Sequence, residues 1–493
     1  MSSKGARVTR INGIDFQFVK SLLTSLFQRE EYSSLTKRGE GRFSGHVVSI
    51  MIMIRLVPLY PELQIMKRIL ITIAFCTLMT TAATVHAQYY LGVIQGEAKK
   101  IPLAVLAVVD ETGAPALRDE VLGVLQADLR RSQIFDLQDA KKIDMVYSGR
   151  QEPSIELLKR GGTFGLTGVV WGSLQRNGNS FRLNGRLYDA ASGAKLASVQ
   201  FNGGADSVRR LAHSLADEIV ARFTGEKGVA RTRIAYVSDK TGNKELYVMD
   251  YDGKNSQKVT ADRSICMSPA WSPDGRILAY VSYRDKNPDL FGLDLGTGKR
   301  WKISGAEGLN ISPAWSPDGK RLAAALSKDG GTEVYTMTRE GRDLERLTFG
   351  ISDNVAPSWA PNNRELVFNS GRAGTPQLYI MGSDGTNVRR VTFEGSYNAS
   401  PNWSPRGDRI VFVSQVAGLF KIATINPDGS EPRLLTSGPG NDENPSWSPS
   451  GRQLVFSSNR GGRSNIYIMN ADGTELERIT PNDANYTSPS WSP

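Results

Sequence analysis

Few residues of this sequence have the types and the spacing that catalysis or metal binding requires. After residue 87 the chain holds a single histidine, His213, which excludes a metal site built from several imidazoles. His213 falls on the exposed side of a predicted helix, and the pattern places no serine or cysteine beside it as a nucleophile. No Gly-x-Ser-x-Gly elbow, Walker loop or dinucleotide-type glycine-rich turn follows a strand and opens a helix. The sequence therefore predicts no catalytic residue, no metal site, no cofactor and no enzymatic activity.

Aspartates at tight turns are the other candidate ligands. Carboxylates suit calcium, but these aspartates lie in separate repeat units, where they serve turn formation. We expect this structural role for Asp250, Asp252, Asp384, Asp428 and Asp472.

The elements that carry these residues follow a 44-residue repeat. The octet Ser-Pro-Ala-Trp-Ser-Pro-Asp-Gly stands at 268–275 and again at 312–319, with variants further on. Each unit contains four short segments rich in β-branched and aromatic residues, which favour strands. Four strands in about 44 residues form one blade of a β-propeller. The tryptophans that mark the repeat, all 44 residues apart, are Trp271, Trp315, Trp359, Trp403, Trp447 and Trp491.

The two ends of the repeat region complete each other. The first unit, from Arg231, lacks a tryptophan segment, and the last tryptophan segment, 488–493, has no strands after it. Joining the two pieces in one sheet gives six blades and a closed ring, which removes free sheet edges. We expect the tryptophans to pack between blades and not to form a platform for glycans.

The residues before the repeat region show no 44-residue period and alternate between predicted strands and helices. An apolar strand over 101–110 is followed by helices over 115–132, 154–159 and 205–224 and by strands over 166–175, 181–189 and 195–201. The predicted fold is thus mainly β, with a six-bladed propeller over 228–493 preceded by a small α/β domain over 101–227.

The first hundred residues read as targeting sequence and a partner-binding arm. Met66-Lys67-Arg68, an apolar run over 69–79 and small residues up to Ala87 form a signal peptide over 66–87, cleaved between Ala87 and Gln88. Residues 1–65 would then be a non-native upstream extension caused by a misassigned start. Residues 88–100 form either an edge strand of the α/β domain or a mobile arm that adds to a partner's sheet. The apolar part of this arm is Tyr89, Tyr90, Leu91, Gly92, Val93 and Ile94.

The net charge of +10 does not indicate nucleic-acid binding. Residues 1–68 carry eleven Lys and Arg against five Asp and Glu, so most of the excess lies there. The remainder has no basic stripe for phosphates. The apolar run over 69–79 is too short for an ordinary spanning helix, so we expect no direct membrane insertion.

The octets, the junction from Gly228 to Val237 and the segment from Asp128 to Ser132 closely resemble the TolB family. The resemblance implies a monomeric periplasmic protein of the Tol-Pal system, which maintains the outer membrane and supports its constriction during cell division. It further implies that the propeller binds the lipoprotein Pal and that the arm over 88–100 binds TolA.

The resemblance places the Pal-binding face on the loops that lead into the first strand of each blade. Such loops line the mouth of the central channel, where Asn310, Asn354 and Asn398 recur at the repeat period. These amides either form a polar ring for a partner or merely cap the loops; under the first hypothesis, Asn354→Arg with Asn398→Arg abolishes Pal capture in a folded protein. The predicted face comprises Leu309, Asn310, Ser312, Asn354, Val355, Asn398, Asp442, Glu443 and Tyr486.

Two other functions fit a propeller of this kind. In a peptidase the propeller gates a further domain of roughly 250 residues with a nucleophile and a histidine, for which this chain has no space. A glycan-binding periplasmic propeller is the second alternative.

Overall fold

The computed structural model describes residues 100–493 except 143, 144, 146, 148, 150, 205 and 206. The predicted extension over 1–65, the signal peptide over 66–87 with its cleavage point, and the arm residues Tyr89 to Ile94 lie outside the described residues. Within the described part, no helix is both long enough and apolar enough to cross a membrane.

A five-stranded mixed sheet forms the centre of the α/β part. Its order is β2-β1-β3-β4-β5, with β2 and β3 parallel to β1 and the other neighbours antiparallel. β1 is an almost continuous apolar run because its side chains are buried on both faces of the sheet, in two separate apolar clusters. The strands are β1 (Ile101–Glu111), β2 (Phe135–Gln138), β3 (Gly168–Asn177), β4 (Ser180–Asp189) and β5 (Lys195–Gly204).

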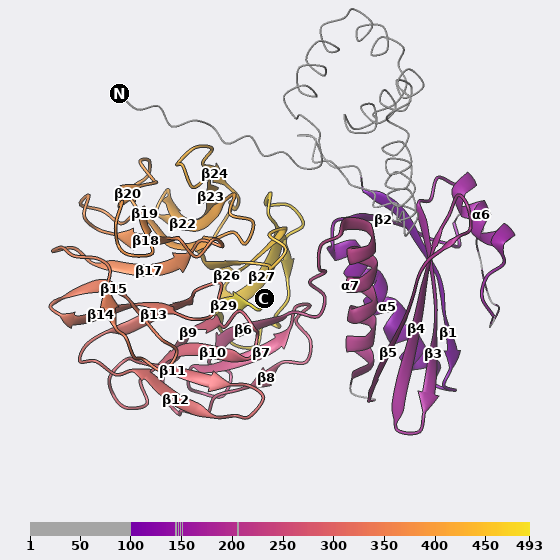
Figure 1. The fold of residues 1–493 in the computed structure, drawn as a ribbon, viewed down its shortest axis with the longest axis horizontal. Coiled ribbons are helices and arrows are strands. Elements are labelled where there is room, and N and C mark those ends of the chain that lie inside the picture. The colour runs from indigo at the N-terminus through magenta and orange to yellow at the C-terminus, as the bar shows by residue number, and fades with distance from the viewer. Residues whose placement is uncertain (1–99, 143–144, 146, 148, 150, 205–206) are drawn as a thin grey trace, which may run out of the picture. The chain divides into compact units, whose positions relative to one another are not determined.

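Helices α5 (Pro115–Arg131) and α7 (Val208–Thr224) lie side by side on one face of this sheet (Figure 1). Proline at the first position of α5 fits a helix start, because the missing N–H would have no partner there. α7 ends at Gly225, whose φ of 72° is the left-handed conformation that favours glycine. The short helix α6 (Ile155–Thr163) packs elsewhere, with Leu158 in a separate apolar cluster around Trp171.

The repeat region folds into six four-stranded antiparallel sheets arranged as blades (Figure 1). The blade that joins both ends of the repeat consists of β29 (Tyr486–Trp491), β6 (Arg233–Ser238), β7 (Glu245–Asp250) and β8 (Gln257–Lys258). The next two are β9 (Cys266–Trp271), β10 (Ile277–Ser282), β11 (Asp289–Asp294) and β12 (Arg300–Ser304), then β13 (Asn310–Trp315), β14 (Leu322–Asp329), β15 (Gly331–Met337) and β16 (Glu345–Arg346).

The remaining three blades follow in chain order. They are β17 (Asn354–Trp359), β18 (Glu365–Ser370), β19 (Gln377–Gly382) and β20 (Arg389–Arg390); β21 (Asn398–Trp403), β22 (Ile410–Val416), β23 (Leu419–Ile425) and β24 (Arg433–Leu434); and β25 (Asp442–Trp447), β26 (Gln453–Gly461), β27 (Arg463–Asn470) and β28 (Glu477–Arg478).

The ring closes as the repeat predicts. The last strand, β29, pairs antiparallel with β6, with Trp491 opposite Ile234 and Tyr486 opposite Ser238. The predicted fold class is therefore confirmed: a small α/β part followed by a six-bladed propeller. One column of the repeat forms the centre of the blade packing, since each member is fully buried: Ile234, Leu278, Leu322, Leu366, Ile410 and Leu454.

Candidate functional site

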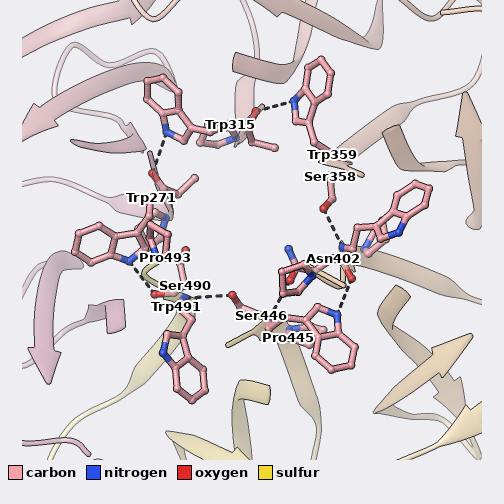
Figure 2. A pocket seen from close by; sticks show the side chains of 18 of the residues that line it. Trp271, Trp315, Ser358, Trp359, Asn402, Pro445, Ser446, Ser490, Trp491 and Pro493 are labelled. Atoms are coloured by element: carbon pink, nitrogen blue, oxygen red, sulfur yellow. Dashed lines mark hydrogen bonds between the residues drawn. The ribbon is translucent and has the colours of Figure 1, made fainter. Parts of the chain in front are cut away.

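The first strands of the six blades line a central channel of about 590 Å³. Its wall consists of the segments around the six repeat tryptophans, so prolines and serines from all six blades meet there (Figure 2). Each first strand contains a bulge at one residue with φ near 50°, for example Ser312 at 54°, which shifts its pairing with the second strand.

The six tryptophans join neighbouring blades. The indole N–H of Trp315 donates to the Ala270 carbonyl at 3.2 Å, and that of Trp359 donates to the Ala314 carbonyl at the same distance (Figure 2). Trp271 closes the ring by donating to the Ser490 carbonyl at 3.0 Å. All six side chains are at least nine-tenths buried. The predicted packing role is thus confirmed, and these rings offer no open face on which a sugar would stack.

The predicted partner-binding residues fall into two groups at the mouth of this channel. We call this mouth the channel rim: the loops that lead into β13, β17, β21, β25 and β29, together with the first three residues of these strands. Leu309 and Glu443 are exposed, and Ser312 and Val355 are half-buried. The side chains of Asn310, Asn354, Asn398, Asp442 and Tyr486 are almost completely buried.

The buried asparagines belong to a polar cluster that recurs between neighbouring blades. Asn354 Nδ2 donates to Glu333 Oε2 at 2.8 Å, and the Thr348 hydroxyl donates to the same oxygen at 2.5 Å. In the next blade Asn398 Nδ2 and the Thr392 hydroxyl both donate to Gln377 Oε1, at 2.9 and 2.7 Å.

The other members of this column are engaged in the same way. Asn310 accepts from the Ser304 hydroxyl at 2.6 Å and donates to the Ala306 carbonyl at 2.7 Å. Asp442 accepts from Lys421 Nζ at 3.3 Å and from Arg460 Nη2 at 2.9 Å. Tyr486 donates to Asp483, and burial together with this carboxylate raises the pKa of its phenol.

These contacts correct the hypothesis of a polar ring. The amides of Asn310, Asn354 and Asn398 already bond to the preceding blade or its connecting loop, so they fix the loops and present little surface to a partner. An arginine at Asn354 or Asn398 would place a charge in a buried site, which costs several kcal/mol unless it is paired. We therefore expect Asn354→Arg with Asn398→Arg to damage the fold, contrary to the expectation from sequence.

Large apolar side chains emerge from the same loops. Phe349 is 71% exposed and Phe393 70% exposed, and Ile351, two residues after Phe349, is fully exposed. Arg346 and Arg390 lie over the two phenyl rings at 4.8 and 5.1 Å, an arrangement that holds the rings in place. Exposed apolar groups gathered in one region mark interaction surfaces.

Sequence reasoning missed these three residues although a signal was present. Phe349 and Phe393 each follow the threonine of the repeat and are themselves 44 residues apart. Exposed phenylalanine is unusual enough that its recurrence in a predicted loop would have identified it.

Glu443 is an exposed acidic residue of the rim. Partial desolvation and the neighbouring Asp442 carboxylate both raise the pKa of its side chain. Asp442 is paired with Lys421 and Arg460, whereas the Glu443 side chain is exposed at this surface.

Comparison with known proteins identifies the family. The family described as "TolB beta propeller domain" matches residues 220–493, and "TolB amino-terminal domain" matches residues 89–196. The chain belongs to the TolB family. Similar sequences are the "Tol-Pal system protein TolB" of Methylobacillus flagellatus, 34% identical over 40% of this chain, and that of Syntrophotalea carbinolica, 37% identical over 42%. The chain spans 45% and 48% of these two curated relatives.

A solved structure of TolB extends the likeness to both parts of the fold. The crystal structure of TolB from Acinetobacter baumannii has a TM-score of 0.68 and 28% identity, covering 82% of this chain and 99% of that one. The TolB-family architecture of an amino-terminal α/β part and a propeller is therefore shown for this chain.

Cys266, in β9, occupies the position that corresponds to Asn310, Asn354 and Asn398 in the later blades. Burial, and then the Asp262 carboxylate, raise the pKa of its thiol to about 12. Roughly one thiol in 10,000 is then ionised at pH 8, and the thiolate is the reactive form. We expect Cys266 in the native protein to resist iodoacetamide and to react rapidly in guanidinium chloride, as read by mass spectrometry of the Cys266 peptide. Equal labelling in both conditions would contradict this assignment.

Proposed function

We propose that this TolB-family protein is a non-enzymatic periplasmic scaffold of the Tol-Pal system. It binds Pal through the channel rim and TolA through the arm over 88–100, and so supports outer-membrane integrity and constriction during cell division. Membership of the TolB family, with relatives named for the Tol-Pal system, is the observation that carries this proposal.

The surface features of the rim support the choice of face. Phe349, Ile351 and Phe393 provide apolar area, and Leu309, Val355 and Glu443 lie at the same ends of the first strands in these and adjacent blades. A partner seated here would cover apolar side chains that water now contacts, at about 25 cal/mol per Å² buried. The buried polar clusters keep the loop backbones fixed, which lowers the entropy cost of binding.

The triple variant Phe349→Ser, Ile351→Ser and Phe393→Ser is expected to bind purified Pal at least about 10-fold more weakly, a loss of about 1.4 kcal/mol. Titration calorimetry with the whole chain measures this affinity. The matched control is Leu344→Ser with Val388→Ser, which removes exposed apolar residues from the outer turns of the same two blades. Unchanged affinity in the triple variant, or an equal loss in the control, would reject the rim as the Pal-binding face.

Deletion of residues 88–100 tests the second surface. We expect the deletion to abolish TolA binding and to leave Pal affinity unchanged, because the rim lies in the propeller. Retained TolA binding would show that residues 88–100 are not the TolA-binding segment.

A further inference from the structure

A histidine and two carboxylates converge where helix α7 meets the turn after β7. One ring nitrogen of His213 and one carboxylate oxygen each of Asp250 and Asp252 lie within 4.8 Å of one another. His213 was expected on the exposed side of its helix, but only 1% of it is exposed. The expectation was wrong because α7 is covered by the sheet and also by Tyr251, whose ring lies edge-on 5.8 Å from the imidazole.

The hydrogen bonds of His213 leave one nitrogen available. Nδ1 contacts Asp128 Oδ2 at 2.6 Å, and Asp128 Oδ1 accepts from the Tyr251 hydroxyl, also at 2.6 Å. Nε2 is buried and has no hydrogen-bond partner among the described residues. A buried polar atom without a partner is costly, so a group bound to Nε2 would offset that cost.

We propose that His213 Nε2, Asp250 and Asp252 form a binding site for a divalent transition metal of the Zn²⁺ class. One imidazole and two carboxylates, with water completing the shell, are ligands that Zn²⁺ accepts. A carboxylate that holds the other ring nitrogen is the usual second partner of a metal-bound histidine, and Asp128 occupies that position. The imidazole favours zinc over calcium or magnesium, which prefer oxygen ligands alone.

Arg209 competes with the metal for this site. Its guanidinium contacts Asp252 and lies 3.5 Å from Glu120. A bound metal would displace the arginine from Asp252, and Glu120 would retain it. The metal would then link α7 to the first blade of the propeller, since Asp250 and Asp252 belong to β7 and its turn.

Zn²⁺ titration of the whole chain, purified without a histidine tag, tests the proposal by calorimetry and by the visible absorption of Co²⁺ in the same site. We expect one Zn²⁺ per chain, and affinity lowered about 10-fold or more by His213→Gln and by Asp250→Asn. Arg209→Gln should shift binding to lower Zn²⁺ concentrations because it removes the competing cation. Ca²⁺ should not substitute.

Two controls keep the result decisive. His46→Gln with His86→Gln removes every other histidine of the chain and should leave binding unchanged. Asp250 is only half-buried, so Asp250→Asn decides the outcome if His213→Gln fails to fold. No Zn²⁺ binding at about 100 μM, or affinity unaffected by either ligand substitution in a folded protein, would overturn the site.

Discussion

Removal of residues 486–493 is expected to abolish the folded propeller. These residues form β29, which supplies the inner strand of the closing blade and pairs with β6. Tyr486 and Trp491 are buried, and Trp491 also donates its indole N–H to Thr232 at 2.7 Å. Loss of a buried aromatic side chain costs about 3–5 kcal/mol, so losing two costs about 6–10 kcal/mol, as much as the about 5–15 kcal/mol that stabilises a typical domain.

Denaturant unfolding followed by tryptophan fluorescence measures this effect. The truncated protein should show no cooperative transition, and a peptide of residues 482–493 supplied in trans should restore one. Deletion of Pro493 alone, which is exposed, is the matched control and should change the midpoint little. A truncated protein with the midpoint of the full chain would show that closure by β29 does not hold the ring together.

Glu333→Ala is expected to lower the free energy of unfolding by about 3–5 kcal/mol, because a fully buried carboxylate with charged and polar partners is removed. Thr348, Asn354 and Arg346 all donate to this side chain, Arg346 at 2.8 Å. Without it, three donors lose their acceptor.

Glu333→Gln is the internal control that the repeat itself suggests. Gln377 occupies the same position of the next blade and accepts from Thr392 and Asn398 there. The amide should therefore retain the threonine and asparagine bonds and lose only the arginine contact, at a cost of about 1.5 kcal/mol or less. Equal destabilisation by alanine and glutamine would show that charge, and not the shared hydrogen-bond pattern, maintains the cluster.

The propeller was predictable because its determinants are local and repeated. Turn residues, strand composition and the tryptophan period lie within one 44-residue unit, and closure followed from matching the incomplete ends. The four-residue strand β2 was missed, since its pairing of Phe135 with Ile101 depends on a distant partner.

Which side chains are buried was harder to predict from the sequence. Asn354 resembles an exposed loop residue until its partner Glu333, 21 residues earlier, is known to lie opposite it. His213 likewise lies on a helix that is covered by a second layer, which one amphipathic pattern does not reveal. Both errors concern contacts between elements that are distant along the chain.

Photo-cross-linking in intact cells tests the central claim, that the channel rim binds Pal, most directly. A photoreactive amino acid at Val355 would lie on the rim, and one at Lys320, which is exposed in the turn after β13, would lie at the opposite ends of the first strands. We predict an adduct with Pal from position 355 and none from position 320. Absence of a Pal adduct at 355, or the same adduct at both positions, would contradict the proposed function of this face.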